Sequence, residues 1–165
     1  MCWLCDHPDA TVEDYLDILR GEIDKHGWAV QYVEDPRHAF AYTVGLHARG
    51  LAELVVTGVT AERAVMLLNG IADYCVKRVQ PKPGETMTLP GGIAEFVQVR
   101  RPDVHLLNAI RIYGPEVCAL QVVWADRRGH WPWCPDFDGG RGSQPVLGAR
   151  VVRGDNRATR RRRSA

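Results

Sequence analysis

The sequence predicts an α+β domain: a mainly antiparallel or mixed sheet of about five strands, with about three helices packed on it. Apolar residues recur at helical spacing in several segments, and runs rich in β-branched and aromatic residues occupy others. These segments follow in the order α-β-β-β-α-β-α-β, which mixes hairpins with longer crossovers. With 165 residues and 45% apolar composition, the chain is long enough to enclose the core of one such domain.

The first predicted element is a helix over residues 12–26. Thr11, followed three residues later by Asp14, is typical of a capping box. Apolar side chains then recur at helical spacing as far as Gly27, and a glycine just past the last periodic residue is a common helix end. Acidic residues between the apolar ones give this helix a solvent-facing side.

Three strands are expected next, over residues 28–33, 40–44 and 51–56. Aromatic and β-branched side chains dominate the first two segments, and the third is mostly apolar. A turn at residues 35–36, Asp-Pro, separates the first two, so we expect an antiparallel hairpin there. Gly58 ends the third strand.

The second half of the chain predicts four more elements. Thr60 is a suitable N-cap for a helix over residues 61–79, which carries a wide apolar face. An alternating strand follows at residues 94–99, and Pro-Asp begins a helix over residues 103–112. Residues 117–124 give the strongest strand pattern, because their nearly continuous apolar run is typical of a central strand covered on both faces.

The overall charge of +1 conceals an acidic body and a basic tail. Residues 1–138 hold 13 Lys and Arg against 19 Asp and Glu, whereas residues 139–165 hold 8 Arg against one Asp. The tail is rich in glycine, poor in aromatic residues, and includes the run Arg160-Arg161-Arg162-Arg163. We therefore expect residues 1–138 to form the single domain, with an N-terminal Cys-x-x-Cys arm, and residues 139–165 to be mostly disordered.

Composition excludes several classes of protein. The chain holds only two serines, Ser143 and Ser164, both in the tail, which excludes a serine hydrolase. It carries neither a phosphate loop nor a dinucleotide-binding fingerprint. Apolar runs are too short for a membrane span, and five cysteines without an export signal indicate reduced thiols. We therefore expect a cytoplasmic protein that does not associate with membranes.

Cysteine and histidine spacing predicts a metal site. Cys2 and Cys5 form a Cys-x-x-Cys pair, and His130 with Cys134 forms a second pair four residues apart. Together they supply the four ligands of a tetrahedral, structural zinc site, with His7 as an alternative ligand. Such a site requires the fold to bring the two ends of the domain together. The alternatives are plain exposed thiols, a redox Cys-x-x-Cys, or an N-terminal cysteine nucleophile, although the last two lack their usual structural context.

A second set of polar residues lies around the end of the second strand. Tyr42, Thr43, His47 and Glu53 could line a ligand-binding cleft, in which Glu53 would orient His47 as a general base. The alternative is that His47 is simply exposed and Tyr42 simply packed in the core.

The ordered series of motifs also carries a family resemblance. They are Cys2-Trp3-Leu4-Cys5-Asp6-His7-Pro8, Gly27-Trp28-Ala29-Val30, Phe40-Ala41-Tyr42-Thr43-Val44-Gly45-Leu46, Glu53-Leu54-Val55-Val56-Thr57-Gly58, Ala119-Leu120-Gln121-Val122-Val123-Trp124 and Trp131-Pro132-Trp133. The series resembles a bacterial family common in actinobacteria, domain of unknown function 4262, over residues 1–137. The resemblance implies one compact bacterial cytoplasmic domain and adds no reaction. The chain departs from the family pattern at Ala52 and at Cys134, where proline and an acidic residue are expected.

These observations lead to one expected function and two alternatives. We expect an accessory or small-ligand-binding domain, stabilised by zinc, whose partner is a small molecule or a protein. The first alternative is a small enzyme with a cleft at Tyr42, Thr43, His47 and Glu53. The second is weak nucleic-acid binding through the arginine tail, since an arginine run supports contact with phosphates of any sequence.

Overall fold

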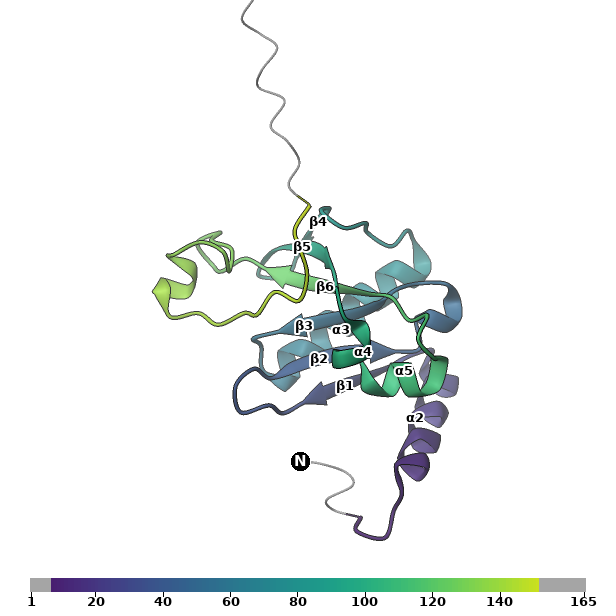
Figure 1. The fold of residues 1–165 in the computed structure, drawn as a ribbon. Helices are drawn as coiled ribbons and strands as arrows, with labels where there is room; N and C mark the ends of the chain where they lie inside the picture. Colours follow the sequence, from purple (N-terminus) through teal and green to yellow (C-terminus); the bar gives the residue numbers. More distant parts are fainter. Residues whose placement is uncertain (1–6, 152–165) are drawn as a thin grey trace, which may run out of the picture.

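A mixed six-stranded sheet forms the centre of the protein in the computed structural model, which describes residues 7–151 (Figure 1). The strand order is β1-β2-β3-β6-β5-β4. The central neighbours β3 and β6 are parallel, and the other four pairings are antiparallel. The strands are β1 (Ala29–Val33), β2 (Phe40–Val44), β3 (Glu53–Thr57), β4 (Thr86–Leu89), β5 (Gly92–Gln98) and β6 (Ala119–Trp124).

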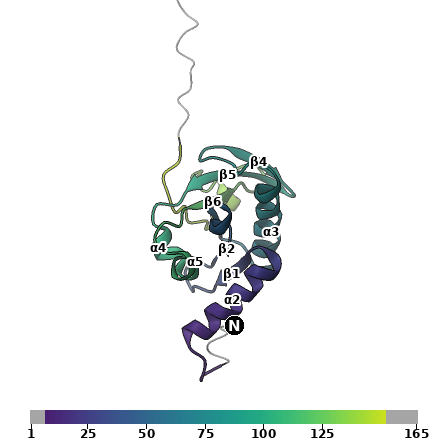
Figure 2. The same cartoon turned by 90° about the vertical axis from the view of Figure 1, so that its right-hand side faces the viewer.

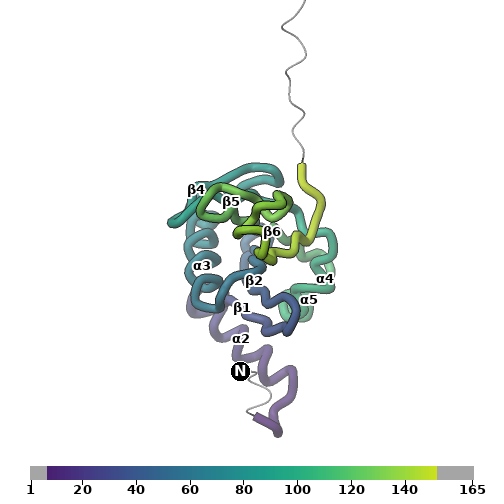
Figure 3. Tube along the Cα trace, turned by 90° about the vertical axis from the view of Figure 1, so that its left-hand side faces the viewer, coloured from purple at the N-terminus to yellow at the C-terminus, as the bar shows by residue number. Residues whose placement is uncertain are grey.

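Helices cover both faces of the sheet. Helix α3 (Ala61–Lys77) packs on one face, while α4 (Pro102–His105) and α5 (Leu107–Tyr113) lie on the other (Figures 2 and 3). Helix α2 (Val12–His26) packs beside β1. The α+β class expected from the sequence is therefore confirmed. Within the described residues, no helix is long and apolar enough to cross a membrane.

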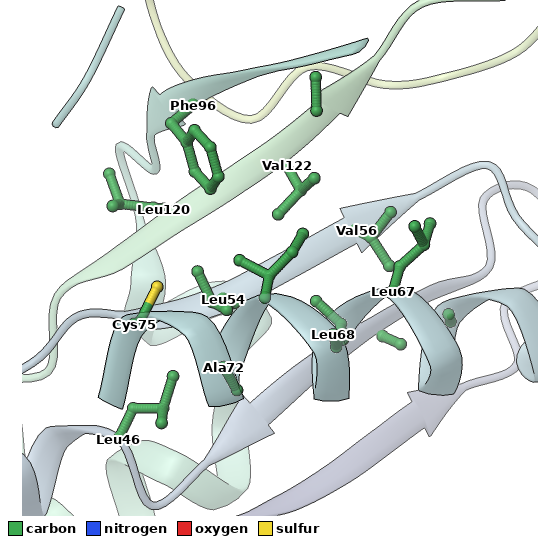
Figure 4. Packing of buried hydrophobic residues seen from close by; sticks show 14 of the residues in the cluster. Leu46, Leu54, Val56, Leu67, Leu68, Ala72, Cys75, Phe96, Leu120 and Val122 are labelled. Carbon is green, nitrogen blue, oxygen red and sulfur yellow. The ribbon is translucent and has the colours of Figure 1, made fainter. Parts of the chain in front are cut away.

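The larger of two hydrophobic clusters lies between α3 and the sheet (Figure 4). Leu67, Leu68 and Cys75 of α3 meet Leu54 of β3 and Val122 of β6, and all five side chains are buried. Each α3 residue falls on the apolar face that the helical spacing predicts. A second cluster on the opposite face joins α2 and α5 to β2, β3 and β6.

The first helix begins and ends where the sequence places it. The Thr11 side chain accepts a hydrogen bond from the backbone N–H of Asp14, and the Asp14 carboxylate accepts one from the backbone N–H of Thr11. Gly27, at φ 92°, ends the helix in the left-handed conformation. The expected hairpin is present as β1 and β2, with the Asp35 carboxylate accepting from the two backbone N–H groups that follow Pro36.

Two elements differ from the sequence expectation. The predicted helix over 103–112 is two helices, because the fully buried Leu106 has a non-helical backbone (φ −101°, ψ 52°) that separates α4 from α5. Strand β4, at the edge of the sheet, was not predicted. It is four residues long, and the surrounding prolines and glycines gave that segment the composition of a loop.

The segment over residues 141–151, which we call the strap, packs against the sheet. The carbonyl oxygen of Pro145 and the backbone N–H of Leu147 both bind the side chain of the buried Gln121 in β6. A Cβ at Gly148 would collide with the carbonyl oxygen of Gln98. This differs from the expectation of a disordered tail starting at residue 139: the strap is held by hydrogen bonds to side chains rather than by a core of its own. Residues 152–165, with the arginine run, lie outside the described residues.

Candidate functional site

Glu53, the first residue of β3, is a fully buried carboxylate. One of its oxygens accepts from the backbone N–H groups of Gly45 (2.8 Å) and His47 (3.0 Å), and the other accepts from the Thr43 hydroxyl (2.6 Å). Thr43 Oγ1 in turn accepts from the backbone N–H of Leu54 (2.8 Å). The carboxylate thus holds the turn between β2 and β3 in place.

Burial raises the pKa of Glu53 above its ordinary value. Hydrogen bonds from Thr43 and from the backbone N–H groups of the turn oppose this shift. Because its contacts are made within the protein and its side chain is inaccessible to solvent, Glu53 has the surroundings of a residue that stabilises the turn.

The side chains of Tyr42 and His47 both contact helix α5. The buried Tyr42 hydroxyl accepts from the backbone N–H of Asn108 (3.3 Å), and burial raises the pKa of Tyr42 to about 12. The His47 ring packs on Tyr113, with ring centroids 5.4 Å apart. The Glu53 carboxylate accepts a hydrogen bond from the backbone N–H of His47. The four residues are therefore neighbours, and the side chains of three of them, Tyr42, Thr43 and Glu53, are buried. That they line a ligand-binding cleft stays a prediction.

Of the four residues predicted to bind zinc, His130 and Cys134 lie in the part of the chain that the structure describes. His130 Nδ1 lies 3.2 Å from a carboxylate oxygen of Asp126, and the half-buried Cys134 donates its backbone N–H to the carbonyl of Trp131. Among residues 7–151, no three histidine, cysteine or acidic side chains are grouped as metal ligands are. Cys2 and Cys5 lie outside the described residues, so the zinc site stays a prediction.

We expect protein purified without a polyhistidine tag to contain one zinc ion per chain, measured by elemental analysis. Cys5→Ser should lose the metal and lower the thermal unfolding temperature, because a structural zinc site contributes folding energy directly. Cys118→Ser, at an exposed cysteine that is not among the predicted ligands, is the control and should retain the metal. Wild-type protein without zinc would contradict the site.

A cavity opens beside the carboxyl ends of the parallel central strands β3 and β6. Figure 1 shows the arrowheads of these strands on the same side, where the loop after β6 projects. The cavity has a volume of about 750 Å³. We call it the arginine cavity; it is lined by Gly58, Val59, Thr60, Arg63, Pro90, Gly91, Trp124, Ala125, Asp126, Arg127, Arg128, Asp138 and Gly139.

One wall of the arginine cavity is the beginning of helix α3. The Thr60 side chain caps the helix by accepting from the backbone N–H of Arg63 (3.4 Å). The Arg63 guanidinium lies over the ring of Trp124, 4.9 Å from its centroid. Trp124 is fixed by a hydrogen bond from its indole N–H to the Thr57 carbonyl (3.0 Å) and by Phe137, whose ring centroid is 5.2 Å away. The cation–π contact therefore orients Arg63 beside the N-terminus of α3.

The carboxylate of Asp126 stabilises the opposite wall of the arginine cavity. The carboxylate accepts from the backbone N–H groups of Arg128 and His130 (both 2.8 Å) and of Asp138 (2.9 Å). Burial acts to raise the pKa of Asp126, but these hydrogen bonds and the nearby His130 outweigh it and lower the pKa to about 2. The ionised Asp126 thereby ties the turn that carries Arg127 and Arg128 to the segment that carries Asp138.

The sequence did not predict this cavity, because residues 126–129, Asp-Arg-Arg-Gly, have only the composition of a turn. A signal was present: two adjacent arginines follow the central strand, and a capped helix start follows another strand at Thr60. Their meeting depended on β3 and β6 being parallel neighbours, and the sequence did not reveal that pairing.

Comparison with known proteins places the chain in one family. The model of that family, described as domain of unknown function DUF4262, matches residues 22–138. Comparisons with curated proteins and with solved structures gave no match. The matched range takes in the whole sheet and every lining residue of the arginine cavity except Gly139.

Proposed function

The chain belongs to the family of the domain of unknown function DUF4262, and from this premise we propose that it binds a small anionic molecule in the arginine cavity. The anionic group is a phosphate or a carboxylate. The sequence predicts a small-ligand-binding domain with a cleft at Tyr42, Thr43, His47 and Glu53. In this proposal the ligand is an anion, and it binds instead beside the carboxyl ends of β3 and β6.

The observation that carries the proposal is a set of three arginines without ionic partners. Within residues 7–151, Arg63, Arg127 and Arg128 form no ion pair, although all three line one cavity. Guanidinium groups have the geometry to bind phosphate or carboxylate through paired hydrogen bonds. Arginines gathered without a carboxylate partner are the arrangement expected of an anion-binding site.

The position of the cavity supports the same proposal. The N-terminus of helix α3 lines the cavity at Thr60 and Arg63 and brings the positive end of the helix dipole to it. In sheets with parallel strands, ligands commonly bind outside the carboxyl ends of those strands. A volume of about 750 Å³ lies within the range of small-molecule sites.

Titration with inorganic phosphate tests the proposal. In two-dimensional ¹H–¹⁵N NMR spectra, phosphate should shift the backbone amide signals of Thr60, Arg63 and Arg128. The double variant Arg127→Gln/Arg128→Gln should weaken binding about tenfold or more, because each charge-assisted hydrogen bond contributes about 1.5–3 kcal/mol.

Arg78→Gln is the matched control, since Arg78 is an exposed arginine just after the other end of α3. It should bind phosphate as the wild type does. Equal weakening in Arg78→Gln would indicate a general charge effect and contradict the site, and so would unchanged binding in the double variant.

A further inference from the structure

We propose that the natural ligand of the arginine cavity is a phosphate ester of a polyhydroxylated molecule, with Asp138 binding its hydroxyl groups. The inference rests on the proposed anion site and names the class of ligand. It starts from a feature that an anion site alone does not explain: a carboxylate that lines the same cavity as three arginines.

Asp138 is held in an unusual conformation. It is the one residue other than glycine with positive φ (48°) in the described part of the chain, and it lies between the buried Phe137 and Gly139. Its backbone N–H donates to the buried carboxylate of Asp126 (2.9 Å). The left-handed conformation is uncommon for residues with a side chain, and it persists only where the surroundings maintain it. Here Asp126 fixes Asp138 relative to Arg127 and Arg128.

The carboxylate of Asp138 is available for a ligand. The side chain is exposed, and within residues 7–151 it forms no ion pair with the arginines of the same cavity. A ligand that fills the cavity and places an anionic group on the arginines therefore meets a hydrogen-bond acceptor at Asp138. That position requires a donor on the ligand, either a hydroxyl or an amine.

Charge decides between these two donors. Three arginines and the N-terminus of α3 face the cavity, against two carboxylates, and the Asp126 carboxylate is already occupied by backbone N–H groups and His130. An ammonium group would be repelled by this excess of positive charge, whereas a neutral hydroxyl would not. Phosphate is the preferred anionic group, because its several oxygens can accept from separate guanidinium groups at once.

The test compares sorbitol 6-phosphate with n-hexyl phosphate, which have the same carbon chain with and without hydroxyl groups. The wild type should bind sorbitol 6-phosphate about tenfold more tightly, as expected for hydrogen bonds to a charged acceptor. Asp138→Asn should reduce this preference, and Asp138→Gly should abolish it. Asparagine and glycine both tolerate positive φ, so neither variant strains the loop.

The possible outcomes separate the inference from the anion site. If hexyl phosphate binds as tightly as sorbitol 6-phosphate, or if the preference persists in Asp138→Gly, the role of Asp138 is overturned while the anion site stands. If neither ester nor inorganic phosphate binds the wild type, phosphate binding in the arginine cavity is contradicted, and the inference fails with it. Loss of sorbitol 6-phosphate affinity in Asp138→Asn, with hexyl phosphate affinity unchanged, supports the inference.

Discussion

Glu53→Ala is expected to lower the free energy of unfolding by about 3–5 kcal/mol, measured by urea titration with tryptophan fluorescence. The variant removes the acceptor of the buried N–H groups of Gly45 and His47, together with the partner of the Thr43 hydroxyl. Buried donors without an acceptor cost about 1–3 kcal/mol each, and the lost side chain leaves a cavity. The backbone N–H groups of Gly45 and His47 then have no acceptor in the turn.

Two further variants separate this cause from a general loss of charge. Glu53→Gln retains an oxygen for both backbone N–H groups, and its amide can donate to Thr43 Oγ1, so it should cost about 1 kcal/mol. Glu116→Ala removes an exposed carboxylate and should change stability by less than about 0.5 kcal/mol. A Glu53→Ala variant as stable as Glu116→Ala would contradict the role given to Glu53.

The raised pKa of Glu53 predicts that the stability of the protein depends on pH. Burial raises the pKa of Glu53 in the folded state above the ordinary value of 4.5, so the folded protein binds this proton more tightly than the unfolded chain does. Its stabilising contribution is complete below pH 4.5 and is lost as the pH rises through the folded-state pKa. The stability of the wild type relative to Glu53→Gln should therefore decrease from acidic to neutral pH. An increase over this range would contradict a raised pKa.

Gln121→Leu is expected to release the strap and to lower the free energy of unfolding by about 2–4 kcal/mol. The buried Gln121 amide donates to the Thr57 hydroxyl (3.0 Å) and the Pro145 carbonyl (2.7 Å), and its oxygen accepts from the backbone N–H of Leu147 (2.6 Å). Leucine fills a similar volume but offers none of these hydrogen bonds. Hydrogen exchange should then show fast exchange of the Leu147 amide, whose hydrogen bond to Gln121 should protect it in the wild type.

Gln80→Leu is the matched control for this experiment. Gln80 also binds backbone through both ends of its amide, but both hydrogen bonds are to Ala52 (2.9 and 2.8 Å) and neither is to the strap. It should lower stability and leave the Leu147 amide protected. If Gln121→Leu leaves that protection unchanged, the strap is held by other contacts, such as the Arg150–Glu95 ion pair (3.0 Å).

Local signals in the sequence explain which elements were predicted correctly. The capping box at Thr11 and the continuous apolar run in β6 each depend on residues close together in the chain. Strand β4 escaped prediction because it is short and its hairpin with β5 lies in a segment with the composition of a loop. The division at Leu106 escaped prediction because that side chain is buried in the second cluster, among residues from distant segments. The strap also escaped prediction, because its glycine and arginine content indicates disorder unless the acceptors and donors of Gln121 are known.

The α+β class, the family and the places of most helices and strands follow from the amino-acid sequence, because helical spacing, alternation and capping are properties of neighbouring residues. The burial of Glu53 in a turn, and the position of Arg63 with Arg127 and Arg128 around one cavity, follow from the three-dimensional fold. The cavity brings together residues tens of positions apart through the parallel pairing of β3 with β6. Such a pairing is fixed by the packing of the whole sheet.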